Sequence, residues 1–398
     1  MSPPPLANAT LPGWPHFDAD QIDAVRGVLD SGRVNYWTGE HGRLFEREYA
    51  DHVGVGHGIA LANGSVALEL ALYALGIGPG DEVIVTPRTF IASASSIVIR
   101  GATPVFADVD PISQNITADT IAPHIGPRTR AIICVHLAGW PCDMDPITAL
   151  ARQHGLKVIE DCAQAHGARY RGRPVGSFGD MAAFSFCQDK IITTGGEGGM
   201  LVTDDEALWD KAWSYKDHGK RYATVHAPRA AHETGFRWVH ESFGSNFRMT
   251  EMQAAIGRIQ LRRLAEWVEC RRSNAAILID RLAAHPLLEI PVPGADIHHA
   301  YYKFYVFLDD ARLRRDWSRD RVVGAITARG IPCFSGSCSE VYLEKAFADS
   351  PYRQQQRLPS AQRLGERSLM LLVHPTLDAA HMQHTADIVD DVLTQARA

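Results

Sequence analysis

The stretch Thr129–Ala163, TRAIICVHLAGWPCDMDPITALARQHGLKVIEDCA, decides the fold that the sequence predicts. It begins and ends with a run of apolar residues, and its middle segment, 143–155, has helical spacing and stops at Gly155. Apolar runs without polar alternation are typical of strands that are covered on both faces. A parallel pair of strands needs a long crossover connection, which is usually a helix, so a helix between two strands favours a parallel pair. The stretch therefore predicts one strand–helix–strand unit of a parallel sheet.

The same alternation extends from residue 58 to residue 204. A helical stretch, SVALELALYALG (65–76), separates the first two of seven candidate strands. We therefore expect an α/β fold in which helices flank a mainly parallel sheet of seven strands. Ligands of such sheets bind beyond the carboxyl ends of the strands. The candidate strands are GIALANG (58–64), EVIVTPRTF (82–90), TPVFADVD (103–110), TRAIICVHLAG (129–139), LKVIEDCA (156–163), DMAAFSF (180–186) and GGMLVTD (198–204).

The chain divides into three predicted parts. A long helix is expected over 250–284, with Thr250 as its N-cap and Gln253 as the matching residue of a capping box. The proline-rich segment 286–297 follows, as expected near a domain boundary. The predicted parts are an extended N-terminal arm, a large domain and a smaller C-terminal α/β domain, which are residues 1–20, 21–265 and 266–398.

Composition argues against several classes of function. The 398 residues are 45% hydrophobic with a formal net charge of -6, which gives no reason to expect a nucleic acid or an anionic membrane as partner. No apolar segment reaches the about 20 residues that span a bilayer, and the N-terminus does not resemble a signal peptide. Seven cysteines without a C-x-x-C pair argue against a disulfide framework or a zinc site, so we expect a cytoplasmic protein without a metal. The pairs Arg262–Arg263 and Arg271–Arg272 are expected on the solvated face of the long helix.

A single lysine raises the question of function. Lys190 lies in AFSFCQDKIITTGGEGGM (183–200), between an apolar run and a segment rich in threonine and glycine. On a solvated loop this lysine would need no explanation. Beside a cofactor it would be a nucleophilic amine, which forms a Schiff base when its pKa is lowered or another cation is near. The choice depends on the groups at the other strand ends.

Three strand ends supply such groups. Asp161 follows a buried strand and would either cap the next helix or keep the ring nitrogen of pyridoxal phosphate (PLP) protonated. Gly64 and Ser65 open a helix whose free N–H groups suit a phosphate, although many strand–helix turns look alike. Phe90, expected at the end of its strand, would be a core residue or would stack on a flat ring. Together with Lys190, these groups predict a PLP site.

The chain resembles the DegT/StrS family of PLP-dependent sugar aminotransferases, which share the fold of aspartate aminotransferase (fold type I). The resemblance extends over nearly the whole chain and is most specific around Asp161 and Lys190. It implies an enzyme that transfers an amino group from glutamate or glutamine to a nucleotide-linked keto-sugar, for the synthesis of amino sugars in polysaccharides or glycosides. Further matching segments are VNYWTGEHGRLFEREYA (34–50), ANGSVALELAL (62–72), YKDHGK (215–220), FGSNFRMTEMQAAIGRIQL (243–261) and HAYYKFYVF (299–307).

The resemblance implies a role for each matching residue at the cofactor. Lys190 would form the Schiff base and move the proton during transfer, and Asp161 would bind the pyridinium nitrogen. Gln164 would contact the phenolic side of the ring, and Phe90 would stack on the ring face. The phosphate would be bound by Gly64, Ser65 and Ser185.

Three further residues are implied at the edges of the site. Asn246 matches a residue that reaches the phosphate of the neighbouring subunit, which implies a homodimer with shared active sites. Thr38 and His299 fall near the sugar by the same resemblance. The segment IPCFSGSCSEVYLEKAF (331–347) departs from the His-Tyr-Pro segment common in the family. Because that segment lies close to the substrate in relatives, the departure leaves the sugar open.

Three alternatives remain open at this point. A PLP-dependent sugar dehydratase of the same family is disfavoured because that branch carries histidine where this chain has Lys190. A cysteine desulfurase on a related fold would need Cys333 or Cys338 as nucleophile, although cysteines are commonly buried for packing alone. A non-catalytic PLP-binding regulator would need another functional segment, and no basic helix-turn-helix is evident.

Overall fold

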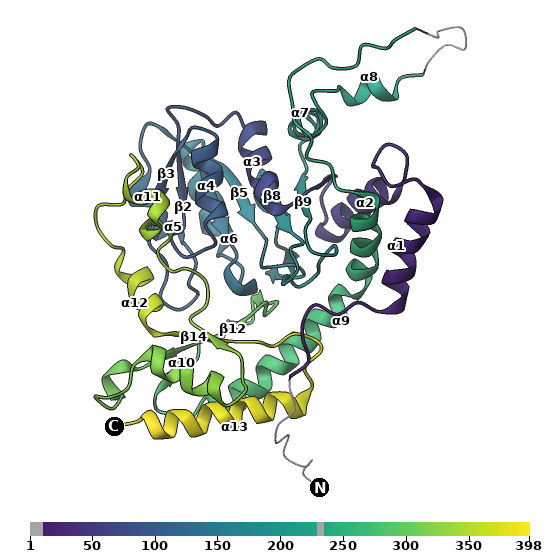
Figure 1. The fold of residues 1–398 in the computed structure, drawn as a ribbon. Helices are drawn as coiled ribbons and strands as arrows, with labels where there is room; N and C mark the ends of the chain where they lie inside the picture. The colour runs from purple at the N-terminus through teal and green to yellow at the C-terminus, as the bar shows by residue number, and fades with distance from the viewer. Residues whose placement is uncertain (1–10, 229–234) are drawn as a thin grey trace.

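The chain is described by a computed structural model that covers residues 11–228 and 235–398. Its main sheet has seven strands: β1 (His57–Leu61), β2 (Glu82–Val85), β3 (Thr103–Phe106), β4 (Thr129–Val135), β5 (Lys157–Asp161), β8 (Met181–Ser185) and β9 (Gly199–Thr203). Their order is β1-β9-β8-β5-β4-β2-β3 (Figure 1). The pairs from β3 through β2, β4 and β5 to β8 are parallel, and β9 pairs antiparallel with β8 and β1. The predicted mainly parallel α/β fold is confirmed.

The stretch Thr129–Ala163 forms the predicted unit. Strands β4 and β5 pair in parallel, and α6 (Met144–His154) connects them. Gly155 ends this helix with a φ of 66°, a left-handed conformation that glycine adopts without steric cost. Its N–H group donates to the carbonyl groups of Ala151 and Arg152. The glycine stop predicted from the sequence is therefore present.

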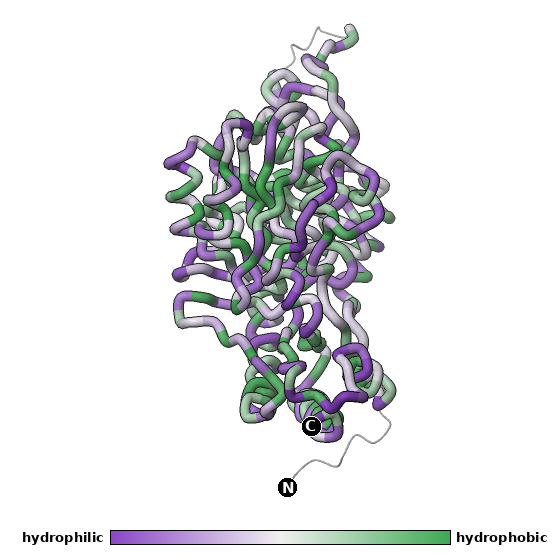
Figure 2. Tube along the Cα trace, turned by 90° about the vertical axis from the view of Figure 1, so that its left-hand side faces the viewer, coloured by the Kyte–Doolittle hydropathy of each residue, from purple (hydrophilic) through white to green (hydrophobic). Residues whose placement is uncertain are grey.

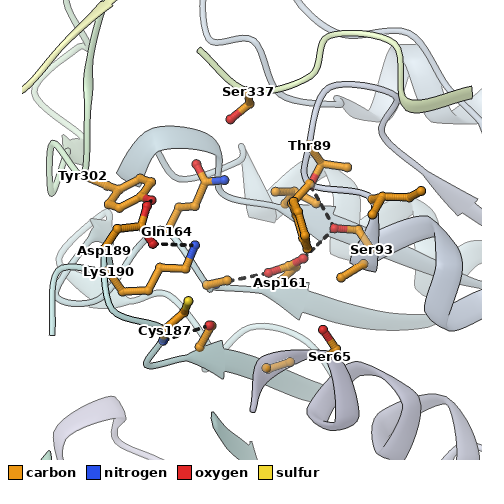
Figure 3. A pocket seen from close by; sticks show the side chains of 18 of the residues that line it. Ser65, Thr89, Ser93, Asp161, Gln164, Cys187, Asp189, Lys190, Tyr302 and Ser337 are labelled. Carbon is orange, nitrogen blue, oxygen red and sulfur yellow. Dashed lines mark hydrogen bonds and ion pairs between the residues drawn. The ribbon is translucent and has the colours of Figure 1, made fainter. Parts of the chain in front are cut away.

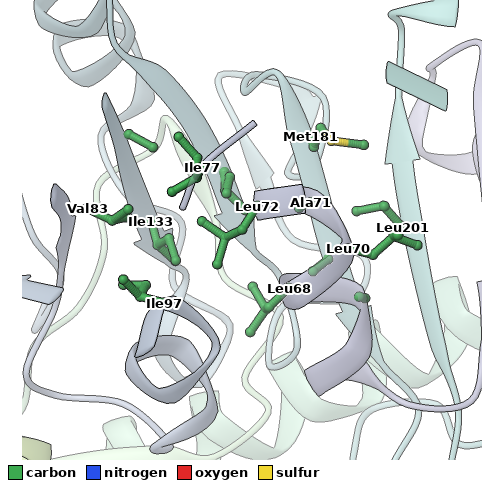
Figure 4. Packing of buried hydrophobic residues seen from close by; sticks show 14 of the residues in the cluster. Leu68, Leu70, Ala71, Leu72, Ile77, Val83, Ile97, Ile133, Met181 and Leu201 are labelled. Carbon is green, nitrogen blue, oxygen red and sulfur yellow. The ribbon is translucent and has the colours of Figure 1, made fainter. Parts of the chain in front are cut away.

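Alternate residues of the main sheet face two different helix layers. Val83 and Val85 pack in the cluster under α3 (Gly64–Ala74), α4 (Ala92–Ile99) and α7 (Glu206–Lys216), whereas Ile84 faces the opposite side. Figure 4 shows Leu72 and Ile97 packed against Ile133 of the sheet. The opposite layer holds α2 (His41–Val53), α5 (Ala118–Ile121), α6 and α9 (Glu251–Leu282). Two covered faces explain why the strands have continuous apolar runs.

A second, smaller sheet follows in the chain. It has the order β10-β12-β14-β13, and α10 (Arg319–Ala328) and α13 (Ala379–Ala396) pack with it around a separate apolar cluster. Its strands are β10 (Leu288–Glu289), β12 (Phe304–Leu308), β13 (Cys333–Phe334) and β14 (Ser368–Leu371). Shorter elements complete the chain: a three-stranded sheet of β6 (Arg169–Tyr170), β7 (Arg173–Pro174) and β11 (Ile297–His298), and the helices α1 (Ala19–Ser31), α8 (Tyr222–His226), α11 (Lys345–Ala348) and α12 (Pro359–Arg367).

The 32-residue helix α9 runs alongside both sheets (Figure 1). It begins with the predicted capping box, in which the Thr250 side chain accepts from the Gln253 N–H group and the Gln253 side chain accepts from the Thr250 N–H group. The predicted domain boundary at residue 265 falls inside this helix. The division into domains 21–265 and 266–398 stays a prediction. The first ten residues of the predicted N-terminal arm lie outside the described residues.

An arm that carries α8 projects from the body between α7 and α9 (Figure 1). We define it as residues 217–228 and 235–248. Figure 2 shows that hydrophobic segments concentrate inside the body, around the main sheet. Within residues 11–228 and 235–398, we find no helix with the length and apolarity required to span a bilayer.

Candidate active site

A cavity of about 1060 Å³ opens at the carboxyl ends of β5 and β8. Figure 3 shows Lys190, Asp161 and Ser65 facing this space from three different segments of the chain. The sequence had predicted that functional groups meet at this edge of the sheet. Seven of the ten predicted site residues line the cavity: Gly64, Ser65, Phe90, Asp161, Gln164, Ser185 and Lys190.

The amine of Lys190 points into this cavity from the loop between β8 and β9. The side chain is 15% exposed, and its Nζ lies 3.9 Å from Oδ1 of Asp189. The same Nζ lies 5.1 Å from the ring centroid of Tyr302, whose hydroxyl group donates to Asp189. Trp14 holds the backbone, because its Nε1 donates to the Lys190 carbonyl oxygen at 2.8 Å. Within the part of the chain that the structure describes, Nζ has no direct hydrogen bond, so the amine faces the cavity beside Asp189 and Tyr302.

The glycine-rich loop after Lys190 is attached to α9. Gln260 accepts from the Thr193 N–H group at 2.7 Å, and Gln253 donates to the Glu197 carbonyl oxygen at 2.7 Å. Gly195 has a φ of 89°, and a Cβ there would lie 2.9 Å from Ile256. The glycine thus permits both the turn and the close approach of α9.

Asp161 ends β5 and receives two hydrogen bonds. Ser93 donates to Oδ2 at 2.7 Å, and the Ala163 N–H group donates to Oδ1 at 3.1 Å. Because the only hydrogen of the Ser93 hydroxyl goes to Asp161, the Thr89 hydroxyl must donate to Ser93, from which it lies 2.9 Å. Burial raises the pKa of Asp161, while the bond from Ser93 and the charge of Lys190 oppose this rise. This carboxylate is suited to pair with a cationic nitrogen inside the cavity.

The neighbouring carboxylate, Glu160, has a structural role. It accepts from the N–H groups of Gly176, Phe178 and Gly179 and from Nε2 of His136. Burial alone would raise the pKa of Glu160, but the hydrogen bonds bring it below the usual value.

The ligand atoms of His136, Glu160 and Cys162 lie within 4.8 Å of one another, close enough to hold a metal ion. However, Nδ1 of His136 accepts from the Cys142 N–H group, so Nε2 carries the ring hydrogen toward Glu160. Neither nitrogen is left to bind a metal. This group closes the loop after β5 instead.

The N-terminus of α3 faces Ser185 across the cavity floor. Asn63 caps the helix by accepting from the Val66 N–H group at 3.0 Å, so the preceding N–H groups of Gly64 and Ser65 remain available to an anion. A Cβ on Gly64 would lie 2.7 Å from Cβ of Ser185, so only glycine fits at this approach. These groups form a cradle suited to a phosphate.

His166 supports this cradle from behind. Its Nε2 donates to the Ser185 carbonyl oxygen at 2.8 Å, and its Nδ1 accepts from the Tyr49 hydroxyl at 2.6 Å. Burial lowers the pKa of His166 to about 3, so the imidazole is neutral at physiological pH. Both of its nitrogens are thus fixed in one tautomer.

Two side chains form the walls where a flat ring would lie. Gln164 accepts from the Ala138 N–H group at 2.8 Å, which orients the amide at the cavity. Phe90 is 67% exposed and also lines the cavity. The prediction that Phe90 ends its strand was wrong, because β2 stops at Val85 and Phe90 lies in the following loop. The loop places its ring over the cavity rather than in the core.

Comparison with known proteins agrees with this geometry. Residues 15–390 match the model of the DegT/DnrJ/EryC1/StrS aminotransferase family. The chain belongs to this family.

Individual relatives cover almost the whole chain. It is 41% identical to the UDP-N-acetyl-3-dehydro-alpha-D-glucosamine 3-aminotransferase of Acidithiobacillus ferrooxidans, over 92% of each chain. The solved structure of an aminotransferase from Psychrobacter cryohalolentis is 55% identical with a TM-score of 0.95, covering 97% of this chain and 99% of that one. The structure of DesV from S. venezuelae in complex with a ketimine intermediate is 36% identical with a TM-score of 0.83, covering 94% of each.

Three residues that the resemblance to this aminotransferase family had implied lie outside the cavity. Asn246 lies in the arm, where it forms an isolated bridge with Asp217 and its Oδ1 accepts from the Arg248 N–H group. Thr38 is exposed and donates to a backbone carbonyl in its own turn. His299 is buried and stacks on a neighbouring tyrosine, and burial lowers its pKa to about 3.

Sequence reasoning missed several residues of this candidate site. Ser93 and Thr89 support Asp161, and Asp189 and Tyr302 flank Lys190. Asp189 could have been predicted from its position directly before Lys190. Ser93 could have been found by examining the polar residues in the first turn of α4. Tyr302 had no local signal, because it is distant from Lys190 in sequence and meets it only through folding.

Proposed function

We propose that this chain is a PLP-dependent aminotransferase that moves an amino group from an amino acid to the keto group of a nucleotide-linked sugar. The observation that carries the proposal is the single cavity in which the Lys190 amine, the Asp161 carboxylate and the N-terminus of α3 face one another. These groups suit an aldehyde, a protonated ring nitrogen and a phosphate, respectively. The kinship with named sugar aminotransferases supports the same assignment.

The residues of the cavity fit PLP at both of its ends. The phosphate would lie at Gly64, Ser65 and Ser185, where an added Cβ on Gly64 would close the cradle. Asp161 would hold the ring nitrogen, and its partners Ser93 and Ala163 keep the carboxylate oriented. When bound, PLP withdraws electrons from the substrate carbon so that a proton can leave it.

The protein side chains would then bind and move protons. Of the two lysines that line the cavity, Lys190 is the one whose charge acts on Asp161, and its Nζ would accept the substrate proton and return it during transfer. Gln164 would direct its amide at the ring oxygen, and Phe90 would cover the ring face and exclude water. The volume of about 1060 Å³ leaves room for a substrate beside the cofactor, since small-ligand sites measure about 300 to 1000 Å³.

The donor is proposed to be glutamate or glutamine, and the acceptor a nucleotide-linked keto-sugar. A direct test loads the protein with PLP, adds either donor and follows the visible band of the cofactor. A panel of nucleotide-linked keto-sugars, with mass detection of the aminated product, then identifies the acceptor. A shift of the band with donor and no aminated product from any keto-sugar would contradict the proposed acceptor.

We further propose a homodimer in which Asn246 reaches the cofactor phosphate of the neighbouring subunit. The arm that carries Asn246 exposes three aromatic side chains, Phe236 (76%), Trp238 (85%) and Phe243 (98%). A cluster of this kind on a projecting segment suits a protein interface. Asn246 also lies outside the cavity of its own chain, so a role at the phosphate requires a second copy.

Mixed dimers of Lys190→Ala and Asn246→Ala chains test this arrangement. If Asn246 acts across the interface, one site receives both defects and the other neither, so mixing restores up to about half of the activity per mixed dimer. If it acts in its own chain, every site keeps one defect and mixing restores nothing. Mixed dimers that form but remain inactive, with Asn246→Ala itself impaired, would contradict the shared site.

A cytoplasmic location is also proposed. All seven cysteines are free in the structure, which supports a reducing compartment. Cys333 is buried, and burial raises its pKa to about 12, so it is poorly suited to be the nucleophile of a desulfurase.

A further inference from the structure

The loop that follows β2 carries a buried arginine directly beside the active site. Arg88 is 0% exposed, and the next two residues, Thr89 and Phe90, line the cavity. Arg271 of α9 is buried as well, so the prediction that it lies on the solvated face of its helix was wrong. Arg88 does not itself line the cavity and can act on the site only through its neighbours.

The charge of Arg88 is not balanced by a carboxylate. Its Nε donates to Oε1 of Gln114 at 3.0 Å, and its Nη1 donates to Oγ of Ser339 at 2.7 Å. The guanidinium carbon lies 5.4 Å from the ring centroid of Tyr305. Among the residues that the structure describes, Nη2 has no hydrogen-bond partner, and no acidic side chain forms an ion pair with Arg88. A buried cation in this state is costly, so packing alone does not account for it.

Gln114, one partner of Arg88, has an uncommon backbone conformation. It is 4% exposed with a φ of 67°, in the left-handed region that favours glycine. Its N–H group donates to the Asp110 carbonyl oxygen at 2.9 Å, which fixes the turn. Strained residues persist where the surrounding structure holds them, and they are concentrated at functional sites. The turn therefore presents the Gln114 amide as a fixed anchor for Arg88.

The other partner of Arg88 belongs to a segment that forms one wall of the cavity. We define residues 336–341, which follow β13, as the strap. Gly336, Ser337 and Cys338 of the strap line the cavity. Gly336 has a φ of 90°, and a Cβ there would overlap the ring of Tyr305, whose hydroxyl accepts from the Ser337 N–H group at 2.7 Å. The second sheet thus fixes the start of the strap.

Two backbone hydrogen bonds join the strap to the loop of Arg88. The Thr89 N–H group donates to the Cys338 carbonyl oxygen at 3.1 Å, and the Val341 N–H group donates to the Pro87 carbonyl oxygen at 2.9 Å. Arg88 lies between the two bonded residues of its loop, and its own bond to the strap falls between the two bonded residues there. The arginine therefore closes this joint from the protein interior.

Thr89 connects the joint to Asp161. The Thr89 hydroxyl donates to Ser93, which donates to Oδ2 of Asp161. Because the strap holds the backbone of Thr89, it also sets the position of the first hydroxyl in this relay. Displacement of the strap would remove the donor that keeps the Ser93 hydrogen directed at Asp161.

We propose that Arg88 is a positioning residue of the active site, which holds the strap against the loop after β2 and thereby keeps Asp161 oriented toward the cavity. The inference rests on the proposed aminotransferase function, in which Asp161 pairs with the ring nitrogen. Arg88 acts through Thr89 and Ser93 and does not contact cofactor or substrate.

Hydrogen–deuterium exchange of the PLP-loaded protein tests the joint without turnover. Arg88→Met keeps a long side chain and removes its donors. The amides of Thr89 and Val341 should exchange at least about tenfold faster in this variant, since hydrogen bonds to charged groups have that magnitude. Amides of α13 should be unaffected. Unchanged exchange at both residues would overturn the inference.

Arg100→Met is the matched control. Its guanidinium carbon lies 5.2 Å from the ring centroid of Tyr73, and Arg100 does not line the cavity. This variant should leave exchange in the strap unchanged. If Arg88 only packs, Arg88→Met lowers overall stability and raises exchange in the strap no more than Arg100→Met does, which contradicts the inference. Should Arg88→Met fail to fold, Gln114→Met decides, because it removes the anchor without touching the strap and should also speed exchange there.

A kinetic test separates this inference from the proposed function. The rate at which glutamate or glutamine changes the cofactor band should fall about tenfold in Arg88→Met, because small misplacements cost up to about 10²-fold. Thr89→Val removes only the first hydroxyl of the relay, so adding Arg88→Met to it should slow the reaction no further. A wild-type rate in Arg88→Met, or additive effects, would refute the route to Asp161. If no donor reacts with the wild type, the proposed function fails, and exchange at Thr89 and Val341 still decides whether Arg88 holds the strap.

Discussion

Two lysines of this protein have similar neighbours and different surroundings. Lys190 lies 3.9 Å from a carboxylate oxygen and 5.1 Å from a tyrosine ring, and Lys216 lies 3.7 Å from Glu46 and 3.8 Å from the ring of Tyr36. The side chain of Lys190 is 15% exposed and lines a large cavity, whereas that of Lys216 is fully buried and does not line that cavity.

The difference teaches what makes a lysine available for chemistry. Burial lowers the pKa of Lys216, and the charge of Glu46 opposes this change. A lowered pKa is a property of many catalytic amines, yet no substrate can reach this one. Lys190 differs in its place at the carboxyl ends of the strands, where a ligand has room. Access, more than the immediate neighbours, separates the two lysines.

The strongest test of the comparison is Lys190→Ala. Turnover should fall by at least about 10³-fold, because the amine that moves the proton is absent, while the fold is kept. Single-turnover kinetics with a donor measure the loss. Borohydride reduction of the PLP-loaded wild type should map the adduct to Lys190, and an adduct on Lys216 or any other lysine would reverse the assignment.

Asp161→Asn should have the next largest effect. The amide cannot supply the negative charge that keeps the ring nitrogen protonated, so turnover should fall by about 10²-fold with little change in PLP affinity. Steady-state kinetics and a PLP titration separate the two quantities. Glu160→Gln is the neighbouring control, and it should affect stability, since its carboxylate serves the backbone. Wild-type turnover in Asp161→Asn would refute the role.

Lys216→Met should change stability and spare the chemistry. Removing the cation leaves the Glu46 carboxylate buried, and among the described residues it keeps only its bonds from the Ala60 N–H group and the Tyr36 hydroxyl. We expect a loss of about 3 kcal/mol in the free energy of unfolding, measured with urea. Turnover of the folded protein should change by less than about threefold.

The double variant Lys216→Met with Glu46→Gln should regain part of this stability, because no charge is left unpaired. A loss of turnover in Lys216→Met as large as that in Lys190→Ala, with the fold intact, would break the comparison.

The smallest predicted effect concerns the protonation of His166, which lies behind the phosphate cradle, and its contribution to stability. Burial lowers the folded-state pKa of His166 to about 3 from 6.5, so the unfolded chain binds more protons between these values. Stability from this residue is therefore complete above pH 6.5 and is lost as the pH falls toward 3.

His166→Gln should reduce the slope of unfolding free energy against pH by about 1 kcal/mol per pH unit between pH 4 and 6. Urea unfolding at several pH values measures it. An unchanged slope would mean that water reaches His166 in the folded protein, so that the wall behind the phosphate cradle is not sealed.

The sequence predicted those parts of the molecule that depend on local pattern. The apolar runs of all seven strands, the stop at Gly155 and the capping box at Thr250 were each visible in a short window. Seven of the ten predicted site residues line the cavity. Their meeting could also be predicted, since parallel strands bring their carboxyl ends to one edge of the sheet.

The remainder depends on contacts between distant segments. Tyr302 meets Asp189, and Trp14 meets Lys190, across separations of 113 and 176 residues. Arg271 has the sequence context of a solvated helix, and only the packing of the N-terminal segment and the second sheet buries it. A short window of sequence does not show which surface of a long helix will be covered by both the N-terminal segment and the second sheet.

The length of α9 has a consequence for variation within the family. Its first three turns hold the Lys190 loop through Gln253 and Gln260. Farther along, Arg271 and Asn274 donate to the carbonyl oxygens of Tyr302, which precedes β12, and Leu377, which follows β14. One inserted residue would rotate everything beyond it by about 100°, and even a seven-residue insertion, which nearly restores the phase, would shift the second group by about 10 Å. The number of residues in α9 between these two sets of contacts is therefore fixed. Alignments of related aminotransferases that use both contacts should show no gap between Gln253 and Asn274.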